Sequence, residues 1–128
     1  MKKILITLAA SAIFALANNN TTVNATMSLM NQGMEKIQKG FLLNQKDMIL
    51  EGISMTQSAN SIFKTVDVKT FIAHNNKVQV TKNINANVDR DLEVLKKDVQ
   101  KGHFANATAA YGKVMRDCIS CHTIIRGW

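Results

Sequence analysis

The stretch FANATAAYGKVMRDCISCHTIIRGW, residues 104–128, shows the clearest helical pattern in the sequence. Its apolar and chemically reactive residues recur at alternating steps of four and three residues. This spacing is typical of one face of an α-helix that packs inside a bundle. The stretch therefore predicts a helix from about Phe104 to the end, with the inward face Phe104, Thr108, Tyr111, Met115, Cys118, His122 and Ile125.

The segment 23–41 repeats this pattern and predicts the first helix of the fold. Thr21 or Thr22 is placed to cap its start, and Gly40 is placed to weaken its end. The inward stripe contains three methionines and consists of Val23, Met27, Met30, Met34, Ile37 and Phe41.

Two more helices are predicted between these segments. One runs from Asp47, a suitable N-cap, to about Lys64. The other runs from about Lys82 to Lys101, where Gly102 is a natural stop. The inward residues of the former are drawn from Met48, Ile49, Ile53, Thr56, Ala59, Ile62 and Phe63, and those of the latter are Ile84, Val88, Leu92, Leu95 and Val99.

Residues 65–81 alternate in places like a β-strand, but a single strand would have no partner to pair with. We therefore predict a connection with a helical turn in this stretch. The chain contains no proline. Four helices with short links and one longer crossing predict an all-α fold, an antiparallel four-helix bundle.

The N-terminal residues have the form of a secretory signal peptide. Lys2 and Lys3 form a positive start, residues 4–14 are apolar, and residues 15–17 have the small-x-small form of a cleavage site. The apolar run is too short to span a bilayer. We expect residues 1–17 to be removed, export to the periplasm, and a single mature domain over residues 18–128.

The composition excludes some functions. The formal net charge is +7, and removal of Lys2 and Lys3 lowers it by two. No basic block with interleaved aromatic residues is present, so nucleic acid is not an expected partner. The remaining surplus suits an acidic protein partner, an anionic membrane face or simply a solvated surface. We therefore expect a soluble or loosely membrane-associated protein.

The two cysteines of the chain belong to the motif Cys118-Ile119-Ser120-Cys121-His122, which has the C-x-x-C-H form of a haem-attachment site. In such a motif the two thiols form thioethers with the vinyl groups of haem, and the imidazole reaches the iron. On a helix the three side chains share one face, since they lie at i, i+3 and i+4. The sequence predicts one covalent haem c at Cys118 and Cys121, with His122 as an axial iron ligand.

Three alternative roles for the cysteines fit less well. A thioredoxin-like pair is expected at the opening of a helix in a βαβ unit, whereas this motif lies deep in a helical pattern. A structural zinc site needs four ligands, and only the distant His74 and His103 could add to the cysteines. A plain disulfide leaves the adjacent His122 without a role.

The position of the motif resembles that in the class II cytochromes c, the four-helix family that includes cytochrome c′. In that family the motif lies in the C-terminal helix, and an arginine commonly follows the histidine by four residues, as Arg126 does here. Residues 102–112 also resemble the junction of its third and fourth helices. The resemblance implies that Arg126 packs near His122 and a haem propionate; the alternative is a solvated cation at the helix end.

The sixth coordination position of the iron distinguishes the branches of this family. The low-spin branch uses a methionine of the first helix, which favours electron transfer, whereas an apolar residue leaves the iron five-coordinate and open to small gases. Residues 27–37 resemble the ligand helix of the low-spin branch, with Met27 at the ligand position and Met30 as the second choice. Methionines on such a stripe are also common core residues, so a vacant sixth position stays open. His74 and His103 are expected to face solvent.

The expected function is that of a periplasmic monohaem electron carrier, not an enzyme, with redox proteins of a respiratory chain as partners. The alternative is a five-coordinate cytochrome c′ that binds gases such as nitric oxide, and a third interpretation is a haem-bearing subunit of a larger redox complex. The pattern does not distinguish a monomer from a homodimer, because inward and interface positions share residue types.

Overall fold

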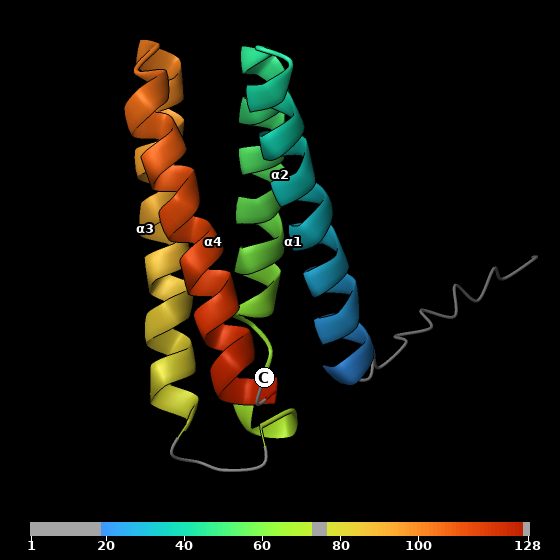
Figure 1. The fold of residues 1–128 in the computed structure, drawn as a ribbon. Coiled ribbons are helices and arrows are strands. Elements are labelled where there is room, and N and C mark those ends of the chain that lie inside the picture. The colour runs from blue at the N-terminus through green and yellow to red at the C-terminus, as the bar shows by residue number, and fades with distance from the viewer. Residues whose placement is uncertain (1–18, 73–76, 127–128) are drawn as a thin grey trace, which may run out of the picture.

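The computed structural model describes residues 19–72 and 77–126 (Figure 1). The expected signal peptide, His74 and the side chain of Arg126 lie outside the described residues. Within them, the chain forms four α-helices and one short 3-10 helix, and it contains no strand. The prediction of an all-helical fold is confirmed.

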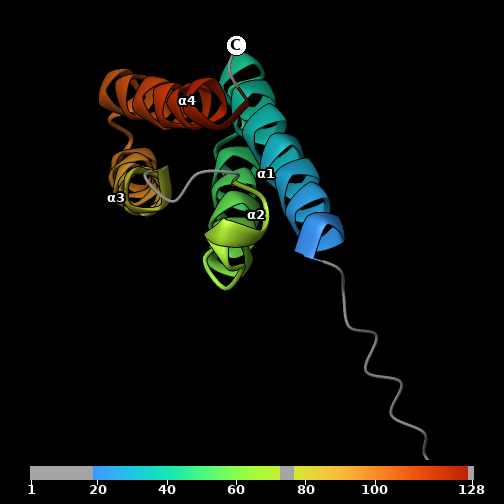
Figure 2. The same ribbon diagram turned by 90° about the horizontal axis from the view of Figure 1, so that it is seen from below.

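The helices pack as two pairs. The first pair is α1 (Asn19–Leu42) and α2 (Lys46–Phe63), and the second is α3 (Val78–Lys101) and α4 (Phe104–Arg126). The 3-10 helix η1 (Val68–Thr70) lies in the connection between the pairs. The turns within both pairs lie at the upper end of the molecule in Figure 1, and α2 and α3 hold the pairs together. Seen from below, α1 and α4 diverge at the lower end (Figure 2).

Several helix boundaries differ from the predicted ones. The first helix begins at Asn19, so Thr21 and Thr22 lie inside it and do not cap it. Gln45 rather than Asp47 is the N-cap of α2. The third helix begins at Val78, four residues earlier than predicted. Its N-cap, Lys77, makes no side-chain capping bond, so the sequence carries no start signal there.

Gly102 ends α3 as predicted. Its φ of 75° is left-handed, and its N–H and that of His103 donate to the carbonyl oxygens of Val99 and Asp98. Because glycine has no Cβ, it adopts this conformation without steric cost. The turn to α4 can therefore be very short.

The core lies between the pairs and is made of aliphatic side chains. The inward residues predicted for α3 are all buried, whereas Ile62 of α2, also predicted inward, is 44% exposed. Full burial of each such side chain contributes roughly 1.5–3 kcal/mol. The apolar residues without measurable exposure are Ile37, Ile53, Leu92, Leu95, Val99, Ala107 and Val114.

The first pair packs backbone against backbone. A Cβ added at Gly52 would lie 2.7 Å from the carbonyl oxygen of Gly33 and 2.8 Å from the amide nitrogen of Ile37. Near the turn, a Cβ at Gly40 would lie 2.8 Å from the amide nitrogen of Ile49. Gly40 lies two residues before the end of α1, and its missing side chain allows α2 to approach this end closely.

A search of the described helices found none with the length and apolar character needed to cross a membrane.

Candidate functional site

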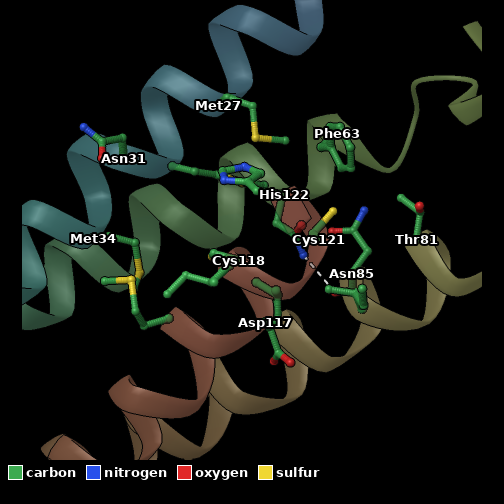
Figure 3. A pocket seen from close by; sticks show the side chains of 16 residues that line it. Met27, Asn31, Met34, Phe63, Thr81, Asn85, Asp117, Cys118, Cys121 and His122 are labelled. Carbon is green, nitrogen blue, oxygen red and sulfur yellow. Dashed lines mark hydrogen bonds between the residues drawn. The ribbon is translucent and has the colours of Figure 1, made fainter. Parts of the chain in front are cut away.

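The C-terminal helix places Cys118, Cys121 and His122 on the wall of a cavity of about 270 Å³ (Figure 3). All three side chains are partly buried. The cavity lies in the lower half of the bundle, where α4 faces α1. Because the residues stand at i, i+3 and i+4 of one continuous helix, the thiols and the imidazole are held on one face.

The opposite wall belongs to α1 and is formed by three methionine side chains. Met27, Met30 and Met34 all line the cavity. In Figure 3, Met27 from α1 and His122 from α4 project into the same space. Met34 is only 6% exposed and also belongs to the hydrophobic core. The parts of the two predicted stripes within residues 27–34 and 115–122 therefore meet at this cavity. The prediction was wrong for Phe104 and Thr108, which are exposed, because the buried face of α4 near its start is formed by Ala107 and Ala110 instead.

A second cavity of about 590 Å³ continues the first toward the end of α4. The two cavities share Met27, Phe63, Cys121 and His122 as lining residues. The second cavity also reaches Val23 and Ile125. The two form one site in the size range of ordinary ligand pockets, about 300–1,000 Å³.

The remaining walls are mostly apolar, from Phe63, Ile84, Val88 and Met115, but α2 contributes one buried amide. Asn60 has no exposed surface. Its Nδ2 donates to Asp89 Oδ1 at 2.6 Å and to the carbonyl oxygen of Asn85 at 3.2 Å, and Lys64 pairs with the same Asp89 carboxylate. Its Oδ1 has no hydrogen-bond partner among the described residues. Asn60 therefore ties α2 to α3 while it lines the cavity.

The thiols are held in their neutral form. Burial, then the charges of Asp117 and Cys121, raise the pKa of Cys118 to about 11, and burial raises the pKa of Cys121. Catalytic thiols of disulfide oxidoreductases have a lowered pKa, because the thiolate is the nucleophile. The environment of this pair is the opposite, which argues against thioredoxin-like chemistry.

A carboxylate pair lies beside the cavity. Asp117, which precedes the motif, has its pKa raised by burial and by the charge of Asp91 on α3. Asp91 is 6% exposed and accepts a hydrogen bond of 3.0 Å from Arg90 Nε. The Oδ2 atom of Asp117 is buried without a partner in the described part of the chain.

No group of three His, Cys, Asp or Glu side chains within residues 19–72 and 77–126 is arranged to hold a metal ion. His103 is exposed, as predicted; it lies in the turn between α3 and α4, and its Nδ1 is 3.8 Å from Asp98 Oδ1. A structural zinc site needs four ligands, and among the described residues His122 is the one such side chain that shares the cavity wall with the cysteines apart from Asp117.

The sequence pattern predicted the cysteines, the histidine and the methionines of the cavity, but not its polar residues Asn60 and Asp117. Asn60 was missed, although it continues the stripe of Ile53, Thr56 and Phe63 at steps of three and four residues. A polar residue at a core position of a helical stripe was the available signal. Asp117 lies off the predicted stripe of its helix, so nothing in the pattern indicated its burial.

Comparisons with protein-family models, with curated protein sequences and with solved structures gave no match. The fold and the cavity are therefore the basis for a functional proposal.

Proposed function

We propose that this chain is a class II cytochrome c: an exported, antiparallel four-helix bundle with one haem c attached to α4. In this proposal it resides in the periplasm and carries single electrons between the redox proteins of a respiratory chain. The observation that carries the proposal is the cavity where Cys118, Cys121 and His122 of α4 face the methionines of α1.

The donor set fits a haem c. Two neutral thiols and an imidazole share one helix face, thioethers lie on the opposite wall, and the intervening lining is mainly apolar. An apolar, partly closed site suits a flat, hydrophobic macrocycle, and soft sulfur with imidazole nitrogen suits its iron. Cys118 and Cys121 would hold the group covalently, and His122 would bind the metal.

Met27 is the methionine best placed to be the second axial ligand. It lines both parts of the cavity together with His122, whereas Met30 lines only the first. Met34 is anchored in the core. The register that assigns the ligand to Met27 therefore agrees with the arrangement of the side chains.

The protein's part in the function is to bind and orient the haem and to exclude water from it. When bound, haem supplies reversible one-electron chemistry. Phe63, Ile84 and Val88 keep the site apolar, and a methionine ligand with low solvent exposure favours a raised reduction potential. The role of Arg126 beside a propionate remains a prediction from the resemblance.

The test is expression of the exported protein in a host that attaches haem to c-type cytochromes. We expect a mass increase of one haem that survives denaturation, and an N-terminus at Asn18. A chain with Cys118→Ala and Cys121→Ala should lose the covalent group. If the unaltered chain gains no haem while a known c-type cytochrome is matured in the same cells, the proposal fails.

An optical spectrum then tests the ligand. We expect low-spin bands with a far-red sulfur-to-iron transition. Met27→Leu should give a high-spin spectrum, whereas Met30→Leu, the matched control, should leave it unchanged; the reverse result would move the ligand by one turn. A high-spin spectrum of the unaltered chain would favour the five-coordinate, gas-binding alternative.

A further inference from the structure

The end of the bundle opposite the cavity exposes large apolar side chains. Leu42 is 78% exposed and Leu43 is 51% exposed, both at the turn between α1 and α2. Phe104, at the start of α4, is 39% exposed and lines a groove together with Phe41 and Asn44. These residues therefore lie at one end, the upper end in Figure 1. We call Leu42, Leu43 and Phe104 the apolar tip.

The turn that carries the leucines is well formed. The Leu43 N–H donates to the carbonyl oxygen of Lys39 at 2.9 Å, and the Gln45 N–H donates to that of Gly40 at 2.8 Å. Asn44 takes the left-handed conformation, with φ of 54°, which asparagine tolerates better than most residues. The leucines are thus exposed by a defined backbone rather than by a frayed helix end.

Exposed lysines surround the apolar tip. Lys39 lies in the last turn of α1, and Lys101 in the last turn of α3. Lys46 begins α2, and its Nζ donates to the carbonyl oxygen of Gln100 at 3.0 Å, so the ends of both pairs are close. Of the nearby carboxylates, Asp47 lies in the first turn of α2 and Asp98 is near His103. The cations exceed the anions at this end.

We propose that the apolar tip binds the surface of an anionic membrane, with the leucines among the lipid chains and the lysines at the phosphates. Exposed apolar side chains beside lysines are the features of an interfacial anchor. Three side chains are too few for a specific protein interface, which needs roughly 1,000 Å² of buried surface. Lysines beside inserted apolar side chains add an electrostatic attraction to anionic lipids, so the binding would be reversible and sensitive to salt.

This orientation has a consequence for the cavity. Because the cavity lies at the other end of the helices, docking through the apolar tip would point it away from the lipid. Membrane docking does not depend on the proposed cofactor, since no residue of the apolar tip lines the cavity.

The test is flotation of the exported, processed protein with two kinds of vesicles. One kind is phosphatidylcholine alone, and the other contains equal parts of phosphatidylcholine and phosphatidylglycerol. We expect flotation with the anionic vesicles only, weakened by salt. The double variant L42S/L43S should bind at least about tenfold less, and Lys39→Gln should weaken binding about fivefold at low salt.

The matched control is the double variant L29S/I62S, which removes two other exposed apolar side chains, one within α1 and one at the end of α2 that lies away from the apolar tip. It should bind like the unaltered chain. Circular dichroism checks that every variant is folded. If L42S/L43S floats as well as the unaltered protein, or the unaltered protein does not float, the proposal is wrong. A change from dimer to monomer in L42S/L43S without vesicles would instead assign the apolar tip to contact between copies.

Discussion

The two helix pairs are packed by different means. In the first pair, Gly33 and Gly52 bring the backbones of α1 and α2 into direct contact. In the second pair, the buried face of α4 consists of the side chains of Ala107, Ala110 and Val114, without a glycine. A Cβ added at Gly112 of α4 would meet no atom within 4 Å. The first pair tolerates no added volume at its crossing, whereas α4 of the second pair has space for a methyl group at Gly112.

This difference shows how the fold provides a cavity. A tightly joined first pair offers a fixed wall of methionines, while the second pair presents its reactive residues across a gap. Asn60 is the buried polar link between the pairs, in addition to the exposed bonds of Lys46, Gln57 and Lys64 to α3. Substitutions in the first pair, at the link and in the second pair should therefore have effects of decreasing size.

The largest effect is expected at the crossing of the first pair. Gly52→Ala would force the new methyl group against the backbone of α1. Overpacking of this kind costs about 2 kcal/mol, in excess of the gain in helix propensity. Urea denaturation followed by circular dichroism measures the free energy of unfolding. An unchanged midpoint would show that α1 and α2 separate without cost.

A smaller loss is expected at the link between the pairs. Asn60→Ala removes the hydrogen bonds to Asp89 and Asn85, which should lower the free energy of unfolding by roughly 1–2 kcal/mol. The exposed Asn83→Ala is the matched control and should change it by less than about 0.5 kcal/mol. If the two substitutions lower the free energy of unfolding equally, Asn60 does not stabilise the contact between the pairs.

A gain in stability is expected in the second pair. Gly112→Ala adds a methyl group in open space and removes the entropy cost of a helical glycine, so it should stabilise the chain by about 0.5–1 kcal/mol. The same denaturation experiment as for Gly52→Ala measures it. The two alanine substitutions should have opposite signs; if both destabilise, the pairs do not differ as described.

The smallest effect concerns Asp117. Its pKa is raised above the usual 3.8, so the folded chain holds this proton more tightly than the unfolded chain. The resulting stability is present below pH 3.8 and is lost as pH rises through the folded pKa. Asp117→Asn should therefore stabilise the chain at neutral pH but not at pH 3. If Asp117→Asn instead lowers the free energy of unfolding at neutral pH, the ionised carboxylate is favourably placed in the folded chain.

Periodicity predicted most of the fold, because four apolar stripes at helical spacing are compatible with little besides packed helices. It identified α4 from Phe104 and the end of α3 at Gly102, where the residue type itself marks the boundary. It missed the start of α3, since Val78 and Val80 alternate like a strand and no capping residue precedes them. Helix ends without caps are set by tertiary packing, which a local pattern does not contain.

The candidate site was predicted unevenly for a related reason. Cys118, Cys121 and His122 are adjacent in sequence, so their motif is visible without a fold. The regular stripe of the first helix indicated Met27, Met30 and Met34 alike, and the resemblance to the low-spin branch selected Met27 among them. Asn60 and Asp117 line the cavity only because the two helix pairs pack together in this arrangement. Such burial depends on contacts between distant segments, which a local sequence pattern does not contain.

The divergence of α1 and α4 around the cavity has a further consequence, for the order of folding. Met27 and His122 belong to the first and last helices, so the cavity joins the segments that are farthest apart along the chain. Each pair, by contrast, is built from neighbouring segments, whose loops close at low entropic cost. Helix content should therefore report formation of the pairs, whereas a probe in the cavity reports their assembly.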